Sequence, residues 1–157
     1  MQVVVVYTQI DAAPEIVFDL ARDMEIHPDT TSGDERVVFA SKRLLELDDE
    51  VEFEARHFGI RHRLRARITE YDRPTVFTDE QLKGPFSQMR HTHRFEQDGT
   101  GTLMTDQFTF SAPCERVVSR YMKRFLAARG RKLAELAHKN AALTTEGGVV
   151  SGPADSS

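Results

Sequence analysis

The sequence predicts an α+β fold in which a curved antiparallel sheet is covered on its concave side by a long C-terminal helix. Three observations support this prediction. Residues 3–10 are β-branched and almost continuously apolar, residues 36–111 follow a two-residue period broken by short turns, and residues after 113 follow a helical period. A strand, a short helical segment, a meander and one amphipathic helix form an α+β order with a single core.

Composition limits the class of protein. A chain of 157 residues is the size of one domain, and 21 Lys and Arg against 25 Asp and Glu give a net charge of −4. No strong basic field therefore favours nucleic acid or an anionic membrane. Cys114 is the single cysteine, which excludes an internal disulfide, and the N-terminus becomes polar too soon for a signal peptide or a membrane span. We expect a reduced, cytoplasmic protein.

The N-terminal region predicts a strand followed by one or two short helices. Residues 3–10 suit a strand that is buried on much of its surface. Asp11 stands at a helix N-cap position and Pro14 fits the first helical turn. The next apolar residues are spaced as one helix stripe, and His27 with Pro28 ends this helix or a second short one.

The middle of the chain predicts an antiparallel meander. Strands are expected at residues 36–40, 50–58, 60–71, 76–83, 88–97 and 102–111. The turns between the later strands contain Gly59, Arg73-Pro74, Gly84-Pro85 and the sequence DGTG at residues 98–101.

Charge predicts the register of the first long hairpin. If Gly59 and Ile60 form a two-residue loop, Glu54 faces Arg65 and Glu52 faces Arg67. The alternating arginines resemble a nucleic-acid stripe, but the glutamates opposite them favour a solvated, ion-paired outer face.

The C-terminal region predicts a long amphipathic helix and then a flexible tail. Pro113 opens the helical pattern, and Gly130 interrupts it, as a kink or as a place of close backbone approach. The domain is expected to span residues 1–138. Residues 139–157 are mostly small and polar, so a mobile tail is predicted there.

The inner face of the predicted sheet carries an unusual number of ionisable groups. Met89, His91, His93 and Phe95 share one face of their strand, because Arg90 and Arg94 belong to the other. A buried polar group without a partner costs about 1–3 kcal/mol, so a pocket explains this face better than a core does. The predicted ligand-binding residues are Phe53, His57, His62, Asp79, Gln81, Phe86, Met89, Phe95, Met104, Phe108, Met122 and Phe125.

Asp106 is the residue of this face that most strongly suggests a catalytic role. A two-residue Asp98-Gly99 turn pairs it with His91, and a four-residue loop pairs it with His93. Either histidine, with its tautomer held by the carboxylate, could act as a general acid or base. His91, His93 and Asp106 are therefore the candidate catalytic residues. Two alternatives stay open: the three groups could bind a ligand, or they could only satisfy one another inside the barrel.

One region of the sequence is similar to a known superfamily. Residues 45–95 read LELDDEVEFEARHFGIRHRLRARITEYDRPTVFTDEQLKGPFSQMRHTHRF, and TLMTDQF and a terminal helix follow. This order resembles bacterial members of the START-like superfamily, also called SRPBCC, which includes polyketide cyclases and dehydrases, lipid-transport proteins and the birch pollen allergens. The resemblance covers residues 3–138. It implies a helix-grip fold with a ligand cavity between the sheet and the C-terminal helix, but no shared catalytic motif.

The two histidines also raise the possibility of a metal site. His91 and His93 could ligate a metal with Asp106 as a third ligand, but such spacing is common in strands and the superfamily suggests no metal. We predict no metal and no cofactor. The segment Gly84-Pro85-Phe86 is expected to cover the mouth of the barrel, with a lid as the alternative.

Three functions follow from this reading. The first is binding or carriage of a small, mostly apolar ligand, and the second is a cyclase, dehydratase or isomerase that uses the His–Asp pair. The third is a protein-interaction module whose cavity is vestigial. A cavity that reaches the histidines favours the first two, and a filled interior favours the third. The predicted partner is a small molecule, without nucleic acid or membrane span; a homodimer is left open.

Overall fold

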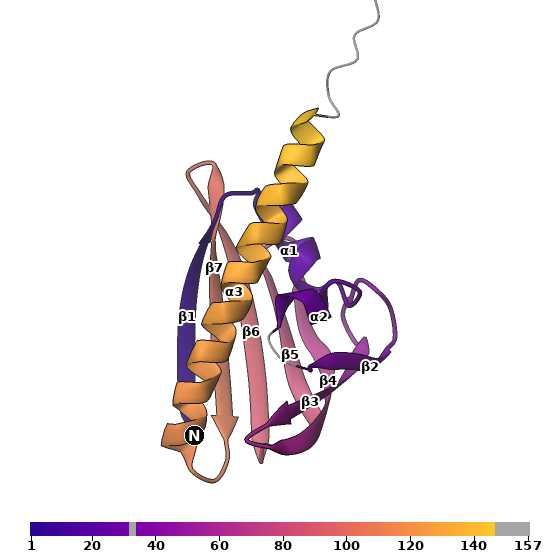
Figure 1. Ribbon diagram of the computed structural model, residues 1–157. Coiled ribbons are helices and arrows are strands. Elements are labelled where there is room, and N and C mark those ends of the chain that lie inside the picture. Colours follow the sequence, from indigo (N-terminus) through magenta and orange to yellow (C-terminus); the bar gives the residue numbers. More distant parts are fainter. Residues whose placement is uncertain (32–33, 147–157) are drawn as a thin grey trace, which may run out of the picture.

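A seven-stranded antiparallel sheet curves around one long helix in the computed structural model, which describes residues 1–31 and 34–146 (Figure 1). The strand order is β1-β7-β6-β5-β4-β3-β2. The strands are β1 (Gln2–Ile10), β2 (Arg36–Ala40), β3 (Glu50–His57), β4 (Ile60–Asp72), β5 (Val76–Lys83), β6 (Gln88–Asp98) and β7 (Gly101–Ser111). The helices are α1 (Pro14–Ala21), α2 (His27–Thr30) and α3 (Glu115–Glu146). The predicted α+β helix-grip fold is confirmed.

The predicted strands agree with these bounds to within one residue. The predicted N-cap of α1 and the predicted start and end of α3 differ from the structure. Ala13, not Asp11, is the N-cap of α1, although Pro14 does begin the helix. Helix α3 begins at Glu115, after Cys114 with its positive φ of 55°, and not at Pro113. It also continues to Glu146, into the segment predicted as a tail, and its last turns project beyond the sheet (Figure 1). Residues 147–157 of that predicted tail lie outside the described residues.

Strand β1 is more exposed than its apolar sequence suggested. It forms one edge of the sheet and pairs with β7. Val4 and Val6 are buried beneath α3, whereas Val3 and Tyr7 on the other face are 54% and 68% exposed. The reason is that one face alone is covered by the helix, so β-branched residues on the other face meet solvent.

The β3–β4 hairpin has the predicted faces but not the predicted register. Phe58 and Gly59 form its two-residue turn, with φ values of 53° and 74°, as a type I′ turn requires. Glu54 therefore faces Arg63 and Glu52 faces Arg65. The shift is two residues, so every side chain keeps its face.

The outer face of this hairpin is ion-paired, as predicted. Arg36 Nη2 donates to Glu54 Oε1 over 2.6 Å, Arg63 Nε donates to Glu54 Oε2 over 2.8 Å, and Arg61 contacts the same carboxylate. These guanidinium groups lower the pKa of Glu54 to about 2. Arg65 and Arg67 bind Glu50 in the same way. The arginine stripe therefore neutralises acidic side chains of its own sheet.

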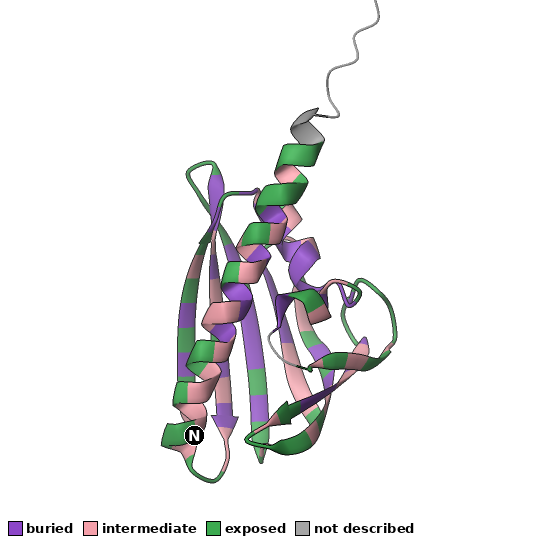
Figure 2. Ribbon diagram, in the orientation of Figure 1, coloured by how far each residue is buried: buried purple, intermediate pink, exposed green. Residues whose placement is uncertain are grey.

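The interior between sheet and helices contains two apolar clusters, and α3 alternates buried and exposed positions along them (Figure 2). In the first, the ring of Phe18 on α1 meets the rings of Phe77 and Phe95 edge to face, with centroids 5.3 and 5.2 Å away. The second gathers Val4, Val6, Met89, Phe108, Phe110 and Leu126.

Gly130 explains how closely α3 approaches the sheet. A Cβ at this position would lie 2.3 Å from Thr8 Oγ1 of β1. The prediction of a close backbone approach is thus confirmed, and the helix rests on β1 at a point where no larger residue fits.

Candidate functional site

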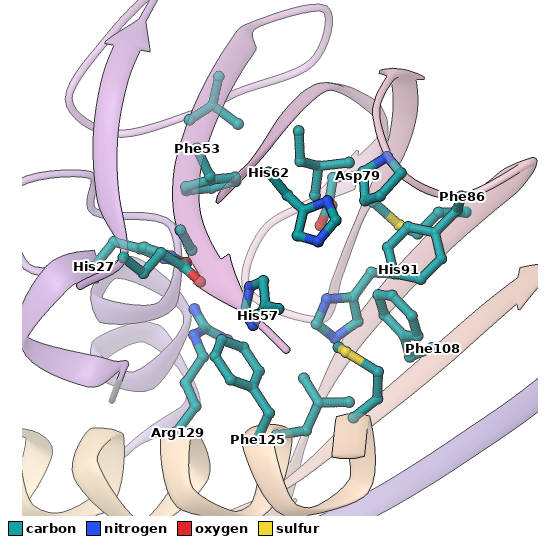
Figure 3. A pocket seen from close by; sticks show the side chains of 18 of the residues that line it. His27, Phe53, His57, His62, Asp79, Phe86, His91, Phe108, Phe125 and Arg129 are labelled. Atoms are coloured by element: carbon teal, nitrogen blue, oxygen red, sulfur yellow. The ribbon is translucent and has the colours of Figure 1, made fainter. Parts of the chain in front are cut away.

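A cavity of about 280 Å³ lies between the sheet and α3, at the lower end of the range for ligand pockets (Figure 3). Its wall is mostly apolar. Most of the predicted ligand-binding residues line it, namely Phe53, His57, His62, Asp79, Phe86, Met89, Phe108, Met122 and Phe125.

Three of the residues predicted to bind a ligand do not line this cavity. Phe95 and Met104 are buried in the cluster beneath α1, with 2% and 0% exposure. Gln81 does not line the cavity, because its amide binds the backbone of Phe86: Nε2 donates to the carbonyl over 2.7 Å, and Oε1 accepts from the amide over 3.2 Å. Alternation along a strand predicts the face of a side chain but not whether helix or empty space lies above it.

These bonds also describe the Gly84-Pro85-Phe86 segment. The Phe86 ring packs against those of Phe108 and Phe110, with centroids 5.5 Å away in each case. The two hydrogen bonds from Gln81 hold the backbone of Phe86 in place. The segment thus covers one end of the cavity as a packed loop, as expected.

The three candidate catalytic residues come together, and a second carboxylate joins them. His93 faces Asp106 in the β6–β7 register, yet His91 also reaches it, with Nε2 2.8 Å from Oδ1. His93 Nδ1 lies 3.0 Å from the same oxygen, at ion-pair distance but without hydrogen-bond geometry. Its Nε2 is bonded to Asp79 Oδ1 over 3.0 Å. The register is thus the predicted alternative that pairs His93 with Asp106, and the one that pairs His91 with Asp106 is wrong. His91 reaches the same carboxylate diagonally across the two strands.

The pKa values of His91 and His93 are shifted in opposite directions. Burial lowers the pKa of His91, and the nearby His93 lowers it further. Burial also opposes charge on His93, but its ion pairs with Asp106 and Asp79 outweigh the effect of burial and raise the pKa of His93. Burial would raise the pKa of Asp106, yet the two histidines hold it well below its usual range. The favoured state has an ionised Asp106 between a neutral His91 and a readily protonated His93.

This state gives His91 a free acceptor nitrogen. If Asp106 is ionised, His91 Nε2 donates to it, so the neutral ring keeps its lone pair on Nδ1. No hydrogen bond among the described residues reaches Nδ1, and His91 lines the cavity, whereas Asp106 lies behind it with 1% exposure. The ring can therefore accept a proton or a hydrogen bond from a molecule in the cavity.

Asp79, His91 and His93 could also hold a metal ion, since their ligand atoms lie within 4.8 Å of one another. The set differs from the predicted one, in which Asp106 was the third ligand. His93 Nε2 and Asp79 Oδ1 already bond each other, so these two ligand atoms have partners without a metal. The absence of a metal stays a prediction.

Arg129 is the most important lining residue that the sequence analysis missed. It is 5% exposed and lies on the inner side of α3. A signal existed, because position 129 falls three residues after Leu126 and four before Leu133, within the apolar stripe of the helix. A long charged residue inside such a stripe indicates a polar site.

Two polar pairs complete the wall. His27 Nε2 lies 2.6 Å from Glu35 Oε1, and burial lowers the pKa of His27 despite this carboxylate. His57 Nδ1 contacts the hydroxyl of Tyr121. Tyr121 could have been found from the sequence, because it lies three residues after Val118 and four before Phe125 in the helical pattern. Glu35 carried no such signal, because it lies outside the predicted elements.

A curved antiparallel sheet that encloses a cavity against a long helix defines the helix-grip class. The chain belongs to the family described as polyketide cyclase / dehydrase and lipid transport, which matches residues 1–138. The predicted START-like resemblance is confirmed. No curated protein matches the sequence. Among the described residues, no helix combines the length and the apolarity that a membrane span requires.

Solved structures show the same fold at low sequence identity. TTHA0849 from Thermus thermophilus is 20% identical with a TM-score of 0.75, over 89% of this chain and 99% of that one. The ginseng major latex-like protein 151 from Panax ginseng is 14% identical with a TM-score of 0.65, over 87% and 97%. Ara h 8.0201 is 12% identical with a TM-score of 0.68, over 88% and 98%. At these identities the likeness concerns the fold alone.

Proposed function

We propose that the protein binds or carries a small, mostly apolar molecule in the cavity between the sheet and α3. The observation that carries this proposal is the cavity itself, an apolar chamber of about 280 Å³ on which a few polar side chains converge. Such a combination is typical of sites that bury an apolar ligand and orient it through a few polar contacts. The family description, which names lipid transport, agrees with it.

The cavity argues against the interaction module with a vestigial pocket. A chamber without a ligand forgoes the contacts that close packing would supply, and proteins usually fill such space. The sequence predicts a cytoplasmic location and no nucleic-acid partner, and both of these stay predictions. Whether the protein forms a homodimer stays open.

The test is whether occupancy depends on the cavity. Val118 lines the cavity from α3, whereas its neighbour Val117 is 57% exposed. Val118→Trp should fill the chamber, and Val117→Trp is the matched control on the surface. We expect untargeted mass spectrometry to find a small molecule retained by the parent and by Val117→Trp, and lost from Val118→Trp.

A neutral fluorescent probe, N-phenyl-1-naphthylamine, gives a second reading of the same comparison. It should bind the parent and the control variant and be excluded from Val118→Trp. Equal retention and equal probe binding by a folded Val118→Trp would contradict the proposal.

A second function, proton-transfer catalysis of the cyclase, dehydratase or isomerase kind, is favoured by one observation. His91 lines the cavity and its Nδ1 makes no hydrogen bond within the described part of the chain, while the buried Asp106 holds its Nε2. This is the arrangement of a general base oriented by a carboxylate. It requires that His91 stays neutral near neutral pH, which an NMR titration of the histidine rings measures.

A further inference from the structure

Arg129 is a buried cation whose donors are not all used. Its Nη2 donates to the carbonyl oxygen of Ala21 over 3.0 Å, which ties α3 to the end of α1. Nε and Nη1 are buried and have no hydrogen-bond partner in the part of the chain that the structure describes. No carboxylate of that part lies within ion-pair distance of the guanidinium either.

This arrangement is costly unless something else supplies an acceptor. Buried donors are almost always hydrogen-bonded, and a buried charge without a partner is more expensive than a neutral group. The guanidinium lines the cavity, and Figure 3 shows it rising from α3 beside Phe125 toward His27. A bound molecule is therefore well placed to complete its hydrogen bonds.

The nearby carboxylates are committed to other groups. Glu35 is bonded to His27 over 2.6 Å, and Asp79 is bonded to His93 over 3.0 Å. The first pair joins α2 to the residue that precedes β2, and the second joins β5 to β6. Both carboxylates thus form hydrogen bonds with histidines and not with Arg129.

We propose that Arg129 donates hydrogen bonds to a carbonyl oxygen of the ligand, so that the cavity takes an apolar molecule bearing a ketone-like group at one end. The inference rests on the proposed function, because it names the chemistry of the molecule that the cavity would bind. It assigns Arg129 as the residue that orients this molecule.

The charges around the cavity favour a carbonyl over a carboxylate. Glu35, Asp79 and Asp106 are three acidic groups, against one permanent cation, Arg129. The region is therefore negative unless two of the three histidines bonded to these acids are protonated. Burial lowers the pKa of two of them, His27 and His91, which opposes that state. A carboxylate ligand would add a further negative charge, whereas a neutral carbonyl accepts the same hydrogen bond without it.

Three probes of nearly equal shape test this assignment. They are 2-acetylnaphthalene, with a carbonyl, 2-ethylnaphthalene, without an oxygen, and 2-naphthoate, with a carboxylate. The readout is the ratio of the dissociation constants of the ethyl and acetyl probes, because this ratio cancels the apolar contribution that both share. Affinities are measured by displacement of N-phenyl-1-naphthylamine.

We expect Arg129→Met to lower this ratio about tenfold, the value of one hydrogen bond to a charged donor. The control is Arg124→Met, which removes an exposed arginine of the same helix and should leave the ratio unchanged. The parent should bind 2-naphthoate more weakly than 2-acetylnaphthalene. If Arg129→Met does not fold, Arg129→Gln keeps a donor for Ala21, removes the charge, and should lower the ratio as well.

The outcomes separate this inference from the proposed function. An unchanged ratio in a folded Arg129 variant would overturn the role of Arg129 while leaving the cavity as a binding site. Tighter binding of 2-naphthoate than of 2-acetylnaphthalene by the parent would overturn the carbonyl in favour of an acid. Exclusion of all three probes and of the dye from the parent would count against ligand binding itself.

Discussion

The two walls of the cavity treat buried charge differently. On the sheet wall, His91, His93, Asp79 and Asp106 each lie within 3.0 Å of an oppositely ionisable partner. On the helix wall, Arg129 has no such partner among the described residues and leaves two nitrogens unbonded. Neighbouring strands bring side chains together at about 5 Å, so polar groups on a sheet find partners within it. Arg129 faces the cavity from the helix and, among the described residues, bonds only the carbonyl oxygen of Ala21, so its remaining donors are available to a ligand.

The largest loss of stability should follow from removing Asp106, which contacts both His91 and His93. Asp106→Ala leaves two buried histidines without their shared carboxylate, and we expect it to lower the free energy of unfolding by about 3 kcal/mol. Urea denaturation measures this loss. Asp106→Asn is the matched control, since it keeps an acceptor oxygen of the same size and should cost less.

Arg129→Met sharpens the comparison with Asp106→Ala. It removes a charge that lacks a partner, so its cost should be smaller than that of Asp106→Ala. If Arg129→Met proved the more destabilising of the two, the proposed difference between the paired charges of the sheet wall and the unpaired Arg129 of the helix wall would be contradicted.

The next effect compares two neighbours on α3. Leu126 is 2% exposed and packs into the second apolar cluster, whereas Phe125 is half-buried and lines the cavity. Leu126→Ala creates a new hole and should cost about 3 kcal/mol. Phe125→Ala enlarges a space that already exists, and we expect about 1 kcal/mol. Chemical denaturation checks the order, and an equal loss at both positions would show that the helix wall is packed as tightly as the core.

The smallest effect concerns the protonation of the two histidines. The pKa of His91 is lowered from 6.5, so its contribution to stability is present above about pH 6.5 and is lost as the pH falls through its folded pKa. The pKa of His93 is raised, so its contribution is present below about pH 6.5 and is lost as the pH rises through its folded pKa. At pH 6.5 we expect a neutral His91 and a charged His93.

Ring signals of the ¹⁵N-labelled protein in an NMR titration distinguish these states. A charged His91 at pH 6.5 would remove the case for a general base, and titration of both rings together would show that the network does not separate their charges.

Strand β6 and the β3–β4 hairpin show how far the alternation of side chains along a strand predicts which residues face the cavity. In β6, alternation placed His91 and His93 inward, and the structure agrees. In β3 and β4, it placed every side chain on the correct face while the register was wrong by two residues. A slip of two residues keeps each face and still sets glutamate against arginine, so neither polarity nor charge could reveal the error.

Local patterns in the sequence determined the strands, the long helix, and the face to which each side chain points, because these depend on residues close together along the chain. Tertiary structure alone decided which part of the inner face is hollow. Phe95 and Met104 share their face with His91 and His93, yet α1 and α3 fill the space above them and leave a cavity farther along the strands. It also decided that Asp79 joins His93 and that Arg129 has no partner among the described residues, since both facts depend on contacts between elements distant in the sequence.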